Sequence, residues 1–151
     1  MRRLAEIFVL FGVIMASAGF AVGQDADLRD VSNPFQEEFE FSIGQTLDLE
    51  IRVEGLRWIV LRASAGDAQD WAAGKKIKTS FTNELENLND MPLTLSAIIL
   101  LEDDRGRQLD RVELKRIRVG GGRYVEDIQK IKIDGASLTE TAKIYIFAEV
   151  K

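Results

Sequence analysis

Residues Leu47 to Val53 alternate without interruption between apolar and charged side chains. Because successive side chains of a β-strand point to opposite faces, this period of two predicts a strand with one buried face. Segments of similar character follow one another along most of the chain. We expect further strands over residues 37–43, 56–63, 77–85, 93–101, 109–119, 124–133 and 144–150. The pattern predicts an all-β fold, an antiparallel, immunoglobulin-like β-sandwich of about eight strands.

Two of these segments carry a further signal. Residues 93–101 begin with alternation and end in a continuous apolar run. This run predicts a central strand that is covered on both faces at one end. In residues 109–119 the apolar phase slips between Leu114 and Ile117. A slip of this kind favours a β-bulge.

The connectors are short and rich in turn-forming residues. A hairpin turn is expected at residues 103–106, a flexible turn at the three glycines 120–122, and the start of the last loop at residues 134–135. One short helix is expected between strands. Its cap, body and end are assigned to Asp67, residues 68–73 and Gly74.

The chain contains no cysteine and no histidine among its 151 residues. These absences exclude disulfides, a thiolate nucleophile, a lipid-anchored cysteine, serine-protease-type triads and zinc sites built on imidazole. A chain of this length forms one domain with a core large enough to fold without a metal. We therefore expect neither a metal site nor a cofactor.

The first 23 residues have the features of a secretion signal. Arg2 and Arg3 precede an apolar run over residues 7–15, and small residues follow up to Gly23. This order is typical of a cleaved signal helix, and an uncleaved membrane anchor is the alternative. We divide the chain into a signal (1–23), an extended lead-in (24–36) and a sandwich domain (37–151), and expect a periplasmic or secreted protein.

Residues 83–93 and 97–106 support a family resemblance. They place an asparagine-containing turn before an apolar strand that ends in an acidic hairpin with Gly106. This arrangement resembles bacterial envelope β-sandwich domains of the FxLYD and related immunoglobulin-like type. The sequence departs from that family at Leu101 and Glu102, where an aromatic residue would be expected. The resemblance implies an accessory binding role and not a reaction.

Charge is unevenly distributed along the chain. The net charge is −5, residues 25–54 are strongly acidic, and residues 105–132 are basic. An acidic protein is poorly suited to general nucleic-acid binding. The basic segment supplies candidate binding residues for an acidic protein or lipid, although a solvated strand face is the simpler account. These residues are Arg107, Arg111, Lys115, Arg116 and Arg118.

Two tryptophans are interpreted differently. Trp58 lies in a strand pattern and is expected in the core. Trp71 lies in the short helix, where it either closes the end of the core or anchors a ligand. With Tyr124, it could provide a stacking surface for a glycan.

Acidic residues allow three further interpretations. Asp25 to Asp30 has the wrong spacing for a calcium loop, so a solvated N-terminal segment explains it better. Asp103 and Asp104 could hold a cation, although a solvated hairpin tip is the simpler account. Carboxylate pairs could in principle support glycoside hydrolysis, but no pair stands out.

We expect a non-enzymatic domain that binds a protein partner in the cell envelope through a sheet edge or face. A glycan-binding module and a carboxylate-dependent hydrolase are the alternatives.

Overall fold

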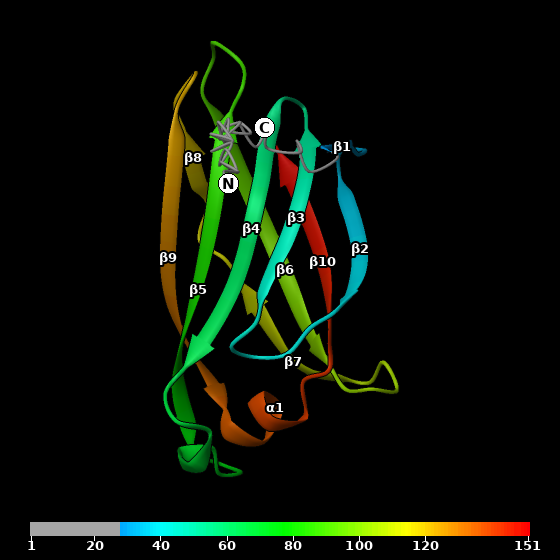
Figure 1. The fold of residues 1–151 in the computed structure, drawn as a ribbon, viewed down its shortest axis with the longest axis vertical. Coiled ribbons are helices and arrows are strands. Elements are labelled where there is room, and N and C mark those ends of the chain that lie inside the picture. Colours follow the sequence, from blue (N-terminus) through cyan, green and yellow to red (C-terminus); the bar gives the residue numbers. More distant parts are fainter. Residues whose placement is uncertain (1–27) are drawn as a thin grey trace, which may run out of the picture.

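The structure is a computed structural model that describes residues 28–151, so the predicted signal segment and the acidic residues up to Asp27 lie outside the described residues. Two sheets pack face to face with one shared apolar core (Figure 1). The predicted all-β, antiparallel sandwich is confirmed. Within residues 28–151, no helix is long and apolar enough to cross a bilayer.

The first sheet has five strands in the order β1-β3-β4-β5-β9. All neighbouring pairs are antiparallel except β1 and β3, which pair in parallel over two residues. Its strands are β1 (Arg29–Asp30), β3 (Thr46–Val53), β4 (Leu56–Ala65), β5 (Lys76–Asn87) and β9 (Tyr124–Asp134).

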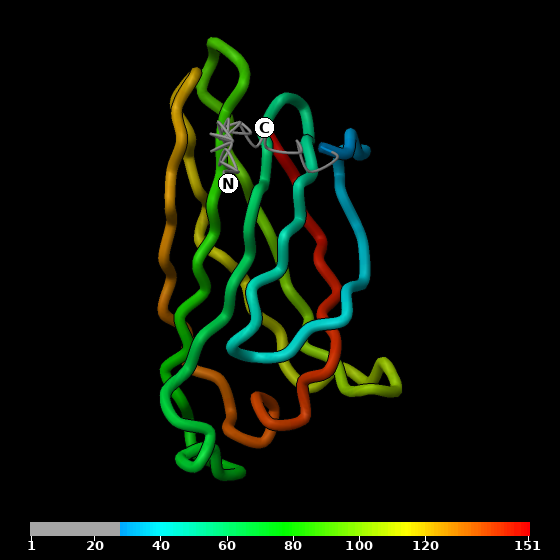
Figure 2. The backbone as a smooth tube through the Cα atoms, in the orientation of Figure 1, coloured from blue at the N-terminus to red at the C-terminus, as the bar shows by residue number. Residues whose placement is uncertain are grey.

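The second sheet has the order β2-β10-β6-β7, and β8 pairs with β6 beyond the end of β7. Its neighbouring strands are all antiparallel. Its strands are β2 (Phe35–Glu40), β6 (Leu93–Glu102), β7 (Gln108–Glu113), β8 (Ile117–Val119) and β10 (Lys143–Val150). Figure 2 shows that the chain passes between the two layers several times.

The core forms because alternate residues of facing strands bury apolar side chains. In β3 these are Leu49, Ile51 and Val53, as the alternation predicts. Trp58 is 1% exposed, which confirms its expected core position. The pairing of β3 with β4 shifts register between Asp48 and Ile51, so this strand also contains an irregularity that the alternation does not show.

The structure differs from the predicted elements in several places. Among residues 28–151, ten strands form instead of about eight, because β1 adds one and residues 109–119 form β7 and β8 instead of one bulged strand. The link between β7 and β8 leaves the sheet because the Gln129 side chain binds both main-chain groups of Lys115, at 2.7 and 2.9 Å. β6 is central as expected, but Ile98 and Leu100 on its outer face remain partly exposed.

The predicted helix over residues 68–73 is only a three-residue 3-10 turn, η1 (Ala68–Asp70), and the Asp67 side chain makes no capping hydrogen bond. A helix forms instead where a loop was expected. It is α1 (Gly135–Glu140), and Asp134 caps it by accepting a hydrogen bond from the Ala136 N–H. Buried Leu138 of α1 closes this end of the sandwich, at the bottom of Figure 1.

Candidate functional site

The strand β9 forms one outer edge of the sandwich, at the left of Figure 1. It pairs with β5 from Tyr124 to Asp134 without a register shift, and within residues 28–151 it pairs with no second strand. A strand in this position presents main-chain donors and acceptors that no neighbouring strand uses. The long free edge is therefore the strongest candidate for a binding surface.

The hydrogen bonds at the two ends of β9 show which residues face outward. Just before the strand, the Asn87 N–H donates to the Arg123 carbonyl at 2.8 Å, and just after it the Gly135 N–H donates to the Lys75 carbonyl at 3.0 Å. Both bonds involve odd-numbered residues, and the main-chain groups of an antiparallel strand alternate in direction. The main-chain groups of the odd-numbered residues of β9 therefore bond to β5. Those of the even-numbered residues point away from β5, outward from the edge of the sheet.

The side chains of these even residues are exposed on the outer face of the sheet. Tyr124 and Ile128 are each 54% exposed, which is unusual for large apolar side chains on one strand. Partial desolvation, and then the nearby carboxylate of Glu84, raise the pKa of the Tyr124 hydroxyl. The exposed members of this series are Tyr124, Glu126, Ile128, Lys130 and Lys132, and the strand ends at half-buried Asp134.

Acidic and basic side chains occupy opposite halves of this outer face. Glu126 lies directly opposite Glu84 on β5, and Lys132 lies directly opposite Lys78. Like charges directly opposite one another destabilise a sheet. Among the described residues, none of these four side chains forms an ion pair within 4.0 Å. The outer face at this edge thus carries one pair of acidic side chains and one pair of basic side chains, and Ile128 lies between the two pairs.

The inner face of β9 is polar at its centre. The Gln129 amide donates to Asp127 at 2.8 Å and also binds the main chain of Lys115. A cavity of about 620 Å³ lies against this part of the edge, lined by Asp127 and Gln129 on one side and by Lys115 and Arg116 on the other. Asp127 lies opposite Asn83 of β5, which is fully buried. Neither polar atom of the Asn83 amide has a hydrogen-bond partner in the part of the chain that the structure describes.

The five basic residues singled out from the sequence do not form one patch. Arg111 lies opposite Leu100 of β6, whereas Arg118 lies opposite Thr94, so about 20 Å of strand separates them. Lys115 and Arg116 lie in the link between β7 and β8, beside the β9 edge. Only these two belong to the edge region.

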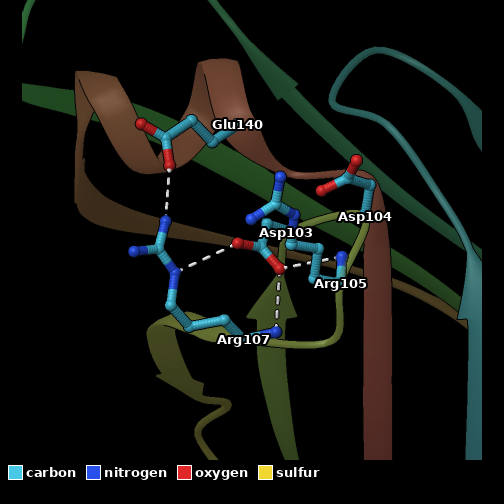
Figure 3. A pocket seen from close by; sticks show the side chains of 5 residues that line it. All are labelled: Asp103, Asp104, Arg105, Arg107 and Glu140. Atoms are coloured by element: carbon cyan, nitrogen blue, oxygen red, sulfur yellow. Dashed lines mark hydrogen bonds and ion pairs between the residues drawn. The ribbon is translucent and has the colours of Figure 1, made fainter.

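Arg107 is held by acidic neighbours at the tip of the β6–β7 hairpin (Figure 3). Its guanidinium donates to Asp103 at 3.0 Å and to Glu140 of α1 at 3.3 Å. The N–H groups of Arg105 and Arg107 also donate to Asp103, and these hydrogen bonds and the guanidinium lower the pKa of the Asp103 carboxyl. The expected hairpin turn is confirmed, and its carboxylate serves to hold the turn.

Trp71 packs against the core, and its indole N–H donates to the Gly66 carbonyl at 3.1 Å. It therefore closes the η1 end of the sandwich, which was the first of its two expected roles. Tyr124 lies at the opposite end of β9 from Asp134, the residue beside this closed end. The two aromatic side chains are too far apart to form one stacking surface.

A second surface lies on the outer face of the other sheet. Ile98 of β6 and Phe147 of β10 are directly opposite one another and partly exposed. They line a shallow groove of about 240 Å³, with Glu113, Arg116 and Lys151 at its rim. This groove is smaller than ordinary ligand pockets of about 300–1,000 Å³. Residues 28–151 also contain no group of three or more carboxylates placed to bind a metal ion.

Sequence reasoning identified residues 124–133 as a strand but did not single out Ile128, Lys130 or Lys132 as site residues. Their exposure follows from the position of β9 at an edge, which depends on strand order. The fold and the site together define an antiparallel β-sandwich with a long free edge strand, β9. The sequence matches no protein-family model, and no curated protein matches it.

Proposed function

We propose that this protein is a non-enzymatic interaction domain that binds an extended segment of a protein partner along β9. The observation that carries the proposal is the free main-chain edge of β9, which runs from Tyr124 to Asp134. A strand added to this edge would form main-chain hydrogen bonds with the even-numbered residues of β9. This recognition mode is called β-augmentation. Because the export signal is expected to be removed, the partner would be met in the periplasm or outside the cell.

The edge lacks three of the devices that protect an edge strand from pairing. Proteins block unwanted edge pairing with proline, short strands and bulges. β9 contains no proline, runs over eleven residues and has no register shift against β5. Its exposed Tyr124 and Ile128 would contact the side chains of an added strand on the outer face.

The test uses a proline at the centre of the edge. In Ile128→Pro the lost N–H is one that points away from β5, so the β5–β9 ladder keeps its bonds. The matched control is Ile128→Thr, which retains the N–H and a β-branched side chain. A display library of random peptides provides defined probes for strand addition.

We expect the protein to enrich peptides with alternating apolar residues. Ile128→Pro should weaken their binding at least tenfold, and Ile128→Thr should weaken it only slightly. Circular dichroism should show that both variants keep the β-sheet spectrum. If peptides bind equally well to Ile128→Pro, or if none is enriched at a protein concentration low enough for the chain to be monomeric, the edge is not the binding surface.

A further inference from the structure

We infer that the strand added to β9 is the β9 of a second copy of this chain, paired antiparallel about a two-fold axis at Ile128. The inference rests on the proposed function of the same edge and names its partner. In this register, residue 126 lies opposite 130 of the second copy, and residue 124 lies opposite 132. The two five-stranded sheets would join into one continuous sheet.

The main-chain geometry fits this register. Antiparallel strands alternate between hydrogen-bonded and non-hydrogen-bonded pairs. Pairing about Ile128 places each even-numbered residue opposite an even-numbered residue of the second copy. These are the residues whose N–H and C=O groups point away from β5, as the bonds at Arg123 and Gly135 show. Each outward-facing group in the paired segment therefore meets a complementary group, which gives about ten main-chain hydrogen bonds.

The charge pattern fits the same register. Within one copy, Glu126 faces Glu84 and Lys132 faces Lys78, so each half of the face repels itself. The two-fold axis places the acidic half of one copy beside the basic half of the other. Glu126 then lies opposite Lys130 of the second copy, and the contact occurs twice because of the symmetry.

The remaining contacts are also complementary. Tyr124 lies opposite Lys132 of the second copy, where the aromatic ring and the ammonium group attract one another. On the inner face, Val125 lies opposite Ile131. Next to this apolar pair, Asp127 lies opposite Gln129, whose amide already donates to Asp127 and to the Lys115 carbonyl within one copy and therefore adds no hydrogen bond between copies.

Lysines on an edge strand ordinarily prevent pairing. In β9 they occupy only the half after Ile128, and an acidic residue occupies the matching position before it. An in-register parallel pairing, or an antiparallel pairing centred on Glu126, Asp127 or Lys130, would bring like charges together. An antiparallel pairing centred on Gln129 would place Ile128 opposite Lys130, whereas the register about Ile128 pairs the apolar side chains with each other and Glu126 with Lys130. The pattern therefore opposes several pairings through like charges, and the register about Ile128 is the one that also keeps the apolar residue at its centre.

The edge strand β2 of the second sheet is a poorer partner for β9. Its outward-facing side chains are already engaged within the chain. Glu38 pairs with Lys143 at 3.1 Å, and Gln36 accepts a hydrogen bond from the Tyr145 hydroxyl at 2.8 Å. Pairing β2 with β9 would also join unlike surfaces and produce open chains of molecules instead of a closed dimer.

The test exchanges the charges that the two-fold axis pairs. Sedimentation equilibrium should show a reversible dimer for the wild-type protein. Glu126→Lys places lysine opposite Lys130 twice, and Lys130→Glu places glutamate opposite Glu126 twice. We expect each variant alone to raise the dissociation constant roughly tenfold or more. The control Asp48→Lys makes the same change of charge as Glu126→Lys, but at an exposed position on β3. It should leave the dissociation constant unchanged.

Restoration gives the decisive result. An equimolar mixture of Glu126→Lys and Lys130→Glu should form a heterodimer, because every paired position then carries opposite charges. The double variant carrying both changes should again form a homodimer. Recovery of dimers also shows that the variants are folded. If neither the mixture nor the double variant recovers the dimer, the register is wrong.

Failure of this inference can be separated from failure of the proposed function. A wild-type protein that stays monomeric, while peptide binding is lost in Ile128→Pro, overturns only the self-pairing. Association that grows beyond two copies supports open-ended pairing and overturns the two-fold register. A dimer that survives Ile128→Pro and both charge changes shows that another surface is used, which also overturns it.

Discussion

At the scale of single residues, two buried asparagines on β5 have opposite environments. The Asn87 amide donates to the carbonyls of Met91 and Val119 at 2.8 and 3.0 Å, and its oxygen accepts from the Asn89 N–H at 2.9 Å. Asn83 is equally buried but has no such partner within residues 28–151. A buried amide stabilises a fold only when its hydrogen bonds are made.

We expect substitutions at these two sites to change stability in opposite directions. Asn87→Ala should lower the free energy of unfolding by about 2–4 kcal/mol, because it leaves buried carbonyls without a donor. Asn83→Val should raise it by about 1 kcal/mol, because it removes an unpaired amide from the core. Urea denaturation measures both. A loss of stability in Asn83→Val would show that the Asn83 amide has a partner.

The carboxylate of Asp103 makes the stability of the protein depend on pH. Hydrogen bonds from Arg107 and Arg105 hold its pKa below the ordinary value of 3.8. A carboxyl group with a lowered folded pKa stabilises the protein above its unfolded pKa, and the effect is lost as the pH falls through the folded value. The wild-type protein should therefore lose stability in acid below about pH 4.

Asp103→Asn should be less stable than the wild type at pH 7, and the difference should shrink as the pH falls below 4. Asp104→Asn is the matched control, because Asp104 is exposed in the same turn and makes no hydrogen bond with the described residues. Thermal denaturation across the pH range measures the effect. An Asp103→Asn profile parallel to that of the wild type would contradict it.

At the scale of elements, the local sequence pattern predicted most strands. The prediction failed where an element is very short or depends on a residue distant in the sequence. The alternation in residues 47–53 identified β3, since a period of two needs no knowledge of neighbours. α1 was missed because its six residues are too few to show helical periodicity, and Asp134 with Gly135 read equally well as a turn. The break between β7 and β8 was read as a bulge because the partner that holds it, Gln129, is distant in sequence.

The glycine turn before β9 also depends on a distant segment. A Cβ atom at Gly121 would lie 1.9 Å from the Asp90 carbonyl oxygen, so the two loops approach closely there. At Gly120 the nearest atom would be in the flexible Arg123 side chain, at 3.3 Å.

Gly121→Ala should therefore lower the free energy of unfolding by about 1–3 kcal/mol, because the backbone of one loop must move. Gly120→Ala should have a much smaller effect, because a side chain can adjust. Urea denaturation of the two variants tests the comparison. Equal stabilities would show that the two loops do not pack as closely as described.

At the scale of the whole molecule, strand order decides which residues are available for binding. The sequence identified β9 as a strand, but no local pattern shows that it lies at an edge and β5 inside the sheet. For the same reason, counting charges along residues 105–132 singled out Arg107, which acidic neighbours already hold. The register, not the chain order, brings Lys132 opposite Lys78 and leaves Ile128 between charges of opposite sign.

The most direct test of the account is amide hydrogen exchange along β9, resolved by residue, at protein concentrations below and above the dissociation constant of the dimer. The odd-numbered amides from Val125 to Ile131 should be protected at both concentrations, since they bond to β5. The amides of Glu126, Ile128 and Lys130 should exchange quickly in the dilute sample and slowly in the concentrated one. Equal exchange of these three amides at both concentrations would contradict the pairing of β9 with a second copy.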